Sequence, residues 1–175
     1  HVLIKLESFG EDTVSIYEAL YKMEPESGET AAALAMAWAR AGRTDEQALE
    51  VYIKGCDLVK DKALVDFFTG QAYFRLGKHE MAGKYVRKAI RGGQTGMNAF
   101  NCLADIYLAT NYRSRKALPV YTRVRSERKG DRAFLEALCD AYIDNKDTGQ
   151  NAWEVCEEVL TLNPDYIPAW IHLAK

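Results

Sequence analysis

The sequence contains few prolines and no long apolar run. Only four prolines occur among 175 residues, which favours a helical protein because proline removes a backbone donor from a helix. No apolar run approaches the ~20 residues that span a bilayer, and residues 1–4 are too short an apolar stretch for a secretory leader. We therefore expect a chain without a membrane segment. Because it begins without methionine, we also expect a fragment of a longer protein.

Cysteine pairs with metal-binding or redox spacing are missing too. The four cysteines lie far apart in the sequence, with no C-x-x-C pair and no histidine at zinc-finger spacing. We expect reduced thiols that pack as small hydrophobic side chains in a helical core, in a reducing, cytoplasmic compartment. The net charge is only −2, which argues against a protein that binds nucleic acid or membranes over its whole surface.

Catalytic signatures are absent as well. The sequence has no G-x-S-x-G, no H-E-x-x-H and no phosphate-binding glycine loop after a strand. Gly92, Gly93 and Gly96 form a glycine-rich stretch, but it follows a predicted helix, which favours a boundary between structural units. We therefore predict no enzymatic activity, no cofactor and no metal site. Any catalysis would belong to another domain of a longer chain.

The sequence does contain an internal repeat, visible as three columns of residues that recur every 34 or 35 positions. Aromatic rings occupy the first column, at Trp38, Tyr73, Tyr107 and Tyr142. Alanines occupy the second column, at Ala48, Ala82, Ala117 and Ala152. The third column holds Tyr17, Tyr52, Val86, Tyr121 and Cys156. A period of this length is typical of stacked repeat proteins, in which each unit buries its apolar face on its neighbours.

Each period predicts two short helices separated by a break. Residues that accept left-handed backbone mark the breaks at Gly42, Gly77 and Asn111, and a fourth break is expected near Lys146. The predicted helices cover residues 29–41, 45–59, 62–76, 79–91, 97–109, 114–128, 132–145 and 149–162. Three further helices are expected: one in residues 1–9, one that follows it and ends at residue 23, and one in residues 168–174. We therefore expect ten or eleven helices and no strands.

Local signals refine the ends of these helices. Asp12 or Thr13 can cap the N-terminus of an early helix. Thr44 with Gln47 resembles a capping box for the helix that follows Gly42. Pro119 lies inside the helix predicted for residues 114–128, so we expect a bend near its first turns.

A unit of two antiparallel helices in about 34 residues resembles the tetratricopeptide repeat. The matching residues in the first helices are Gly70, Tyr73, Leu103, Ala104, Tyr107, Leu138, Cys139 and Tyr142. The break glycines, the second-helix alanines and the segments 162–165 and 170–174 also match. The resemblance covers nearly the whole chain and implies an all-α, right-handed superhelical solenoid. The units are 1–27 (partial), 28–61, 62–95, 96–130, 131–165 and 166–175 (partial), in one array over residues 1–175.

A period of 35 residues also resembles the pentatricopeptide family, which binds single-stranded RNA. That family repeats a polar, base-reading residue near the start of each first helix. The corresponding positions here are Ala32, Phe67, Asn101 and Glu136, which do not form a polar column. Binding of nucleic acid is therefore not expected, and an RNA-binding helical repeat is kept only as an alternative. A regulatory repeat domain of a larger enzyme is a further alternative.

The tetratricopeptide resemblance implies a concave groove, lined by the first helices, that holds a peptide or a partner helix. By the family's register, the groove residues are Met36, Arg40, Phe67, Gln71, Phe74, Arg75, Asn98, Asn101, Asp105, Glu136, Asp140 and Asp144. We expect a protein ligand with an apolar anchor against the two phenylalanines and a basic end against the four carboxylates. The alternative is that the carboxylates form a solvated face and the phenylalanines pack between units.

Two other surfaces carry predictions. The second helices carry a basic set, defined as Lys84, Arg87, Lys88, Arg91, Arg113, Arg115, Lys116, Arg123, Arg125, Arg128 and Lys129. This set could bind an acidic partner or a nucleic-acid backbone, or serve only as a solubilising face. At the C-terminal end, Trp170, Ile171 and Leu173 are expected to pack on further repeats or on another chain.

Overall fold

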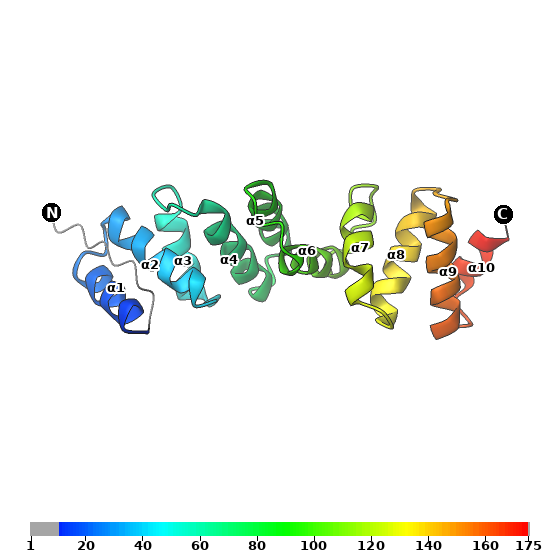
Figure 1. Cartoon of the computed structure of the whole chain (residues 1–175), viewed down its shortest axis with the longest axis horizontal. Coiled ribbons are helices and arrows are strands. Elements are labelled where there is room, and N and C mark those ends of the chain that lie inside the picture. The colour runs from blue at the N-terminus through cyan, green and yellow to red at the C-terminus, as the bar shows by residue number, and fades with distance from the viewer. Residues whose placement is uncertain (1–10, 175) are drawn as a thin grey trace. The chain divides into compact units, whose positions relative to one another are not determined.

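The fold is described by a computed structural model that covers residues 11–174. Within this range the chain forms ten α-helices and one short 3₁₀ helix, and it forms no strand (Figure 1). The helices are α1 (Glu11–Met23), α2 (Gly28–Arg40), α3 (Glu46–Gly55), α4 (Lys62–Arg75), α5 (His79–Arg91), α6 (Met97–Ala109), α7 (Leu118–Val124), η1 (Arg125–Glu127), α8 (Arg132–Asp144), α9 (Gln150–Leu162) and α10 (Ile167–Leu173). The helix predicted for residues 1–9 lies outside the described residues.

The described residues divide into two compact units, one ending at Thr95 and one beginning at Gly96. This division coincides with the boundary predicted between repeats 62–95 and 96–130. In the first unit α2 packs on α1, α3 and α4, and α4 packs on α5. In the second unit α6 packs on α7, α8 packs on α9, and α10 packs on both α8 and α9. Because the loops are short, the consecutive helices of each pair run antiparallel.

The repeat columns of the sequence occupy equivalent places in the helix pairs. All four rings of the first column are buried, and so are all four alanines of the second. In the third column, the Tyr52 hydroxyl donates to the carbonyl of Arg43 at 2.6 Å, and the Tyr121 hydroxyl donates to the carbonyl of Tyr112 at 3.5 Å. Each tyrosine thus bonds to the backbone nine residues earlier, just after the break. The repeat inferred from the sequence is therefore confirmed.

The four predicted breaks share one backbone geometry. The φ angles are +72° at Gly42, +70° at Gly77, +50° at Asn111 and +54° at Lys146. The residue after each break donates its N–H to the carbonyl of the preceding column ring, for example Lys78 to Tyr73 at 2.9 Å. This hydrogen bond satisfies a carbonyl at the end of the first helix, and it needs the left-handed residue that precedes the donor.

Two predicted N-termini are wrong. The structure starts α1 no later than Glu11, so Asp12 and Thr13 lie inside the helix rather than at its cap. For α3 the cap is Asp45, whose carboxylate accepts from the Ala48 N–H at 2.9 Å. The Thr44 hydroxyl is buried and has no hydrogen-bond partner among the described residues. An ionised carboxylate is the stronger acceptor at the positive end of a helix, which explains why Asp45 takes the position.

The prediction for α7 also needs correction. The sequence suggested a helix over 114–128 with a bend at Pro119, whereas α7 begins only at Leu118 and continues into η1. Pro119 lies in the first turn, where its missing N–H costs no helical hydrogen bond. Residues 114–117 form a turn instead, closed by the Ala117 N–H and the Ser114 carbonyl at 2.8 Å. Helix α3 is also shorter than predicted, because it ends at Gly55 rather than at residue 59.

Candidate functional site

The predicted groove residues all lie on the first helices of their pairs. Helix α2 carries Met36 and Arg40, and α4 carries Phe67, Gln71, Phe74 and Arg75, all in the first unit. Helix α6 carries Asn98, Asn101 and Asp105, and α8 carries Glu136, Asp140 and Asp144, all in the second unit. The predicted residues therefore form two sets, one in each unit.

The two phenylalanines of the first unit differ in exposure. Phe67 is only 8% exposed and packs edge-on against Phe68, with ring centroids 5.2 Å apart. Phe74 is half-buried and faces the His79 ring at 5.3 Å. Phe74 therefore offers more of its surface to a partner than Phe67 does. Arg75, beside it in sequence, is exposed.

In the second unit, Asp140 is tied to two other segments of the chain. Its Oδ2 lies 2.7 Å from Nη1 of Arg113, which belongs to the α6–α7 loop, and its side chain is 12% exposed. Its Oδ1 accepts a hydrogen bond at 2.5 Å from the hydroxyl of Tyr166, which precedes α10. Burial and this carboxylate together raise the pKa of Tyr166. Asp140 thus holds the α6–α7 loop, α8 and the start of α10 together.

Asp144 lies one turn further along α8 and is held much less firmly. Its carboxylate is 3.9 Å from the Arg113 guanidinium, and its side chain is 54% exposed. Ile143, next to it, is half-buried. Of the α8 carboxylates, Asp144 is therefore the one most open to a positively charged ligand.

The remaining two predicted carboxylates have internal partners. Arg128 contacts Asp105 at 2.6 Å and donates to the amide oxygen of Asn101 at 3.0 Å. Glu136 accepts from Arg132 at 2.8 Å and from the Asn163 amide at 2.8 Å. Burial alone raises the pKa of Glu136, but these two hydrogen bonds outweigh it and lower the pKa below its usual value.

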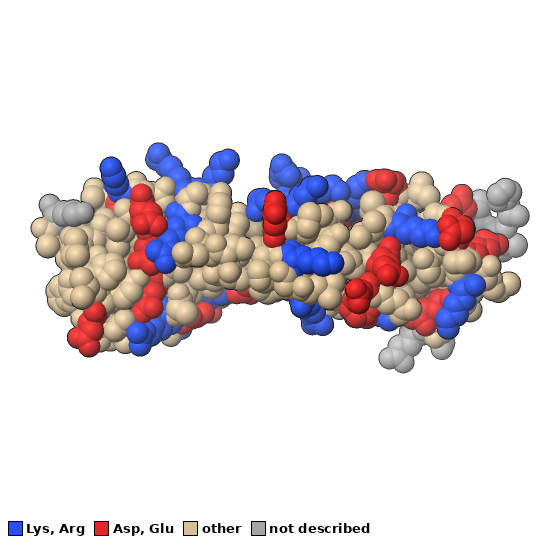
Figure 2. All heavy atoms as spheres, turned by 180° about the vertical axis from the view of Figure 1, so that it is seen from behind, with Lys and Arg blue, Asp and Glu red and all other residues tan. Residues whose placement is uncertain are grey.

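Part of the basic set is neutralised inside the fold. Lys88 pairs at 2.8 Å with Asp66, whose side chain is buried, and Arg125 pairs with Glu158 at 2.9 Å. Arg113 and Arg128 hold the carboxylates described above. Figure 2 shows one face, mostly tan, on which red and blue groups lie side by side in several places while other blue groups protrude from the surface. Fewer cations are thus available to a nucleic-acid backbone than the sequence count suggests.

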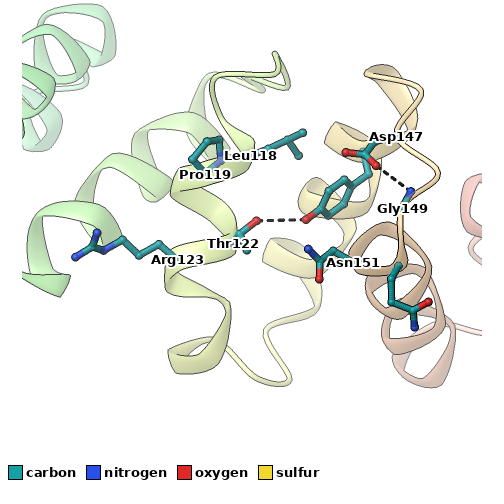
Figure 3. Close-up of a pocket in the computed structure, with 9 residues that line it drawn as sticks. Leu118, Pro119, Thr122, Arg123, Asp147, Gly149 and Asn151 are labelled. Atoms are coloured by element: carbon teal, nitrogen blue, oxygen red, sulfur yellow. Dashed lines mark hydrogen bonds between the residues drawn. The ribbon is translucent and has the colours of Figure 1, made fainter.

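An open pocket of about 600 Å³ lies in the second unit, on the side of the second helices (Figure 3). Leu118, Pro119 and Thr122 of α7 border one side of it, and Asp147 and Asn151 border the other. None of the predicted groove residues lines this pocket. It lies beside the first turn of α7, which begins later than predicted and contains Pro119.

Polar contacts fix the walls of this pocket. The hydroxyls of Thr122 and Tyr142 are hydrogen-bonded at 3.3 Å, which joins α7 to α8 (Figure 3). The Arg123 side chain extends away from the opening, and its guanidinium stacks over the Phe100 ring at 4.0 Å. Sequence reasoning missed the pocket, although Pro119, a residue favoured in the first turn of a helix, was an available signal for the later start of α7.

The last helix exposes Trp170 and Ile171, as the sequence suggested, whereas Leu173, also predicted for this face, is half-buried. Trp170 is 55% exposed, although its indole N–H donates to the Pro164 carbonyl at 2.8 Å. Ile167 and Ile171 are also exposed, whereas His172 is buried. The packing of this face on further repeats or on another chain stays a prediction.

Among residues 11–174, no three His, Cys, Asp or Glu side chains gather in a way that could hold a metal ion. No helix in the described part of the chain is both long enough and apolar enough to cross a bilayer.

Comparison with solved structures identifies the fold. The chain resembles YrrB, described as a TPR protein with an unusual peptide-binding site, with a TM-score of 0.57 and 17% identity over 91% of this chain and 80% of that one. It also resembles two structures of MamA. Their TM-scores are 0.55 and 0.56 at 19% and 20% identity, over 92% and 88% of this chain and 86% and 82% of theirs. No protein-family model and no curated protein sequence matches.

The break geometry, the buried repeat columns and these neighbours lead to one structural assignment. The described chain has the fold of the tetratricopeptide repeat, an all-α array of antiparallel helix pairs.

Proposed function

We propose that the chain is a non-catalytic scaffold that holds a segment of another protein on the exposed side chains of its first helices. Repeat arrays of helix pairs commonly bind partners through such faces. The observation that carries the proposal is the exposed carboxylate of Asp144, which an internal cation reaches only at 3.9 Å. A fold alone does not establish a function, so the proposal depends on this surface.

Two contact areas are proposed, each inside one unit. In the second unit, a basic side chain of the partner pairs with Asp144 and adjacent apolar atoms cover Ile143. In the first unit, an apolar side chain of the partner packs on Phe74, and Met36 and Gln71 of the predicted groove are proposed as further contacts. Asp105, Glu136 and Asp140 already have internal cations or hydrogen-bond donors. Their part is therefore to shape the local potential, which steers association more than it adds affinity.

A peptide selection tests this proposal. The chain is immobilised, peptides are selected from a random displayed library, and the enriched sequences are titrated by calorimetry. We expect enriched peptides to share a lysine or arginine next to an apolar residue. Asp144→Lys should weaken their binding about tenfold or more, which corresponds to ~1.4 kcal/mol, and added salt should also weaken it.

Matched variants on the second helices serve as controls. Glu157→Lys makes the same charge change at an exposed position of α9, and it should leave the affinity within about twofold. Phe74→Ala should weaken the binding of peptides whose apolar residue packs on this ring. Trp153→Ala, which removes an exposed ring of α9, is its control. Selection of no peptide, or equal effects of Asp144→Lys and Glu157→Lys, would reject the proposed surface.

A further inference from the structure

Two cysteine thiols meet between α8 and α9 in the second unit. The Sγ atoms of Cys139 and Cys156 lie 2.7 Å apart, and both residues are 0% exposed. The two helices lie side by side, α8 in yellow and α9 in orange in Figure 1. Both cysteines are free thiols. A disulfide bond is ~2.05 Å long, so the two sulfurs need to approach by less than ~1 Å to form one.

The repeat explains why these two positions are adjacent. The equivalent pairs one, two and three periods earlier in the sequence are Ala104 with Tyr121, Gly70 with Val86, and Ala35 with Tyr52. In each earlier pair a small residue of the first helix faces a larger residue of the second. Only the last pair places two cysteines there.

The Gly70 position shows how closely the two helix backbones approach at this register. A Cβ added to Gly70 would lie 3.0 Å from the backbone nitrogen of Val86 and 2.5 Å from its Cγ2. A disulfide requires Cβ atoms about 3.5–4.5 Å apart. The equivalent position of the α4–α5 pair thus brings two helix backbones close together, in agreement with the short distance between the sulfurs of Cys139 and Cys156.

We propose that Cys139 and Cys156 form a reversible disulfide that joins α8 to α9 when the protein meets a peroxide. One thiolate attacks a peroxide oxygen, the O–O bond breaks, and a sulfenic acid and hydroxide form. The second sulfur then attacks the sulfenic sulfur, the S–O bond breaks, and water leaves with the second thiol proton. Two thiols and one hydrogen peroxide give one disulfide and two water molecules.

The hydrogen bond between the two sulfurs shifts the pKa values of both thiols. The hydrogen bond between the thiols lowers the pKa of Cys156 against the opposing effect of burial, and it raises the pKa of Cys139. Either sulfur can become the attacking thiolate when the two helices separate, and the other sulfur then resolves the sulfenic acid. Elsewhere in the unit, burial raises the pKa of Cys102 to about 12, so that thiol stays protonated and serves as an internal control.

The burial of both sulfurs sets the rate and the consequence of oxidation. Peroxide reaches them only when α8 and α9 separate transiently, so disulfide formation should be slower than the oxidation of an exposed thiol.

Once formed, the disulfide closes a loop that contains the break at Lys146. Cross-links of this kind stabilise chiefly by restricting the unfolded chain. Oxidation should therefore raise the melting temperature of the second unit by several degrees.

Mass spectrometry tests the proposal directly on the full chain. The native protein is treated with hydrogen peroxide, excess peroxide is removed, and the protein is denatured, alkylated and digested with trypsin. Trypsin cuts after Arg132 and Lys146. A disulfide between Cys139 and Cys156 would therefore join the tryptic peptides 133–146 and 147–175. We expect this joined pair, two fewer alkylated thiols, and full reversal by dithiothreitol.

Variants and outcomes complete the test. Cys102→Ala should still give the joined peptides, whereas Cys139→Ala should not, and only the former should keep the rise in melting temperature. Full alkylation of both cysteines after oxidation, or a cross-link that joins other cysteines or two chains, would overturn the proposal. The mapping of the unmodified protein decides the question even if a variant does not fold. The result does not depend on whether the proposed scaffold function is correct.

Discussion

At the scale of single residues, two aspartates one turn apart on α8 illustrate two different roles. Asp140 is largely buried, pairs with Arg113 at 2.7 Å and accepts the Tyr166 hydroxyl. Asp144 is exposed and lies 3.9 Å from the same guanidinium. The sequence alone grouped both as groove carboxylates, because one register placed both on the same helix. Which of them meets a cation depends on Arg113, which lies 27 residues or more away in the chain and whose position the register does not specify.

Replacement of these aspartates should separate the two roles. Asp140→Asn should destabilise the fold by about 1–3 kcal/mol, because it leaves a partly buried Arg113 without its anion. Asp144→Asn should change the free energy of unfolding by less than ~0.5 kcal/mol, as exposed positions usually do. Urea denaturation of both variants measures the difference. Equal losses for the two variants would contradict the distinct roles.

The lowered pKa of Glu136 predicts a pH dependence. Because its folded-state pKa lies below its unfolded value of about 4.5, the carboxylate stabilises the fold above that value. This contribution is lost as the pH falls through the lower, folded-state pKa. Glu136→Gln should therefore cost most stability at neutral pH, and its difference from the unmodified protein should shrink as the solution is acidified. Urea denaturation over a pH series checks this, and a difference that grows on acidification would count against it.

At the scale of the helices, the breaks were more predictable than the caps. Gly42, Gly77 and Asn111 are residue types that accept left-handed backbone, so their sequence identity located the breaks. Lys146 was placed only by the period, yet its φ is +54°. The start of α7 and the cap of α3 could not be deduced in this way. The cap of α3 depends on whether Asp45 or Thr44 bonds to the first turn. The start of α7 depends on whether Pro119 lies in the first turn or further inside the helix.

The left-handed lysine should cost stability that glycine would restore. Lys146→Gly is expected to stabilise the chain by roughly 0.5–1 kcal/mol, because a side chain at positive φ is strained while glycine is not. Asn111→Gly should gain less, since asparagine tolerates this conformation. Thermal unfolding of the two variants gives the comparison. A loss of stability in Lys146→Gly would mean that its side chain makes contacts that outweigh the strain.

At the scale of the whole molecule, the repeat made the architecture predictable and left the binding surface open. Three columns with the same period located nearly every helix pair, because each pair buries equivalent side chains. The pocket between α7 and α9 was not foreseen, because it lies beside α7, which starts later than predicted. The internal ion pairs were also missed, since they join side chains from different helices.

The central claim is that a partner segment binds to the first helices. The most direct test uses a selected peptide with a photoactivatable group at its apolar residue, cross-linked to the chain and mapped by mass spectrometry. The account predicts cross-links on the exposed faces of α8 or α4, close to Ile143 or Phe74, that are competed by the unlabelled peptide. Competed cross-links confined to α7 and α9 around the pocket, or uncompeted ones spread over the whole surface, would contradict it.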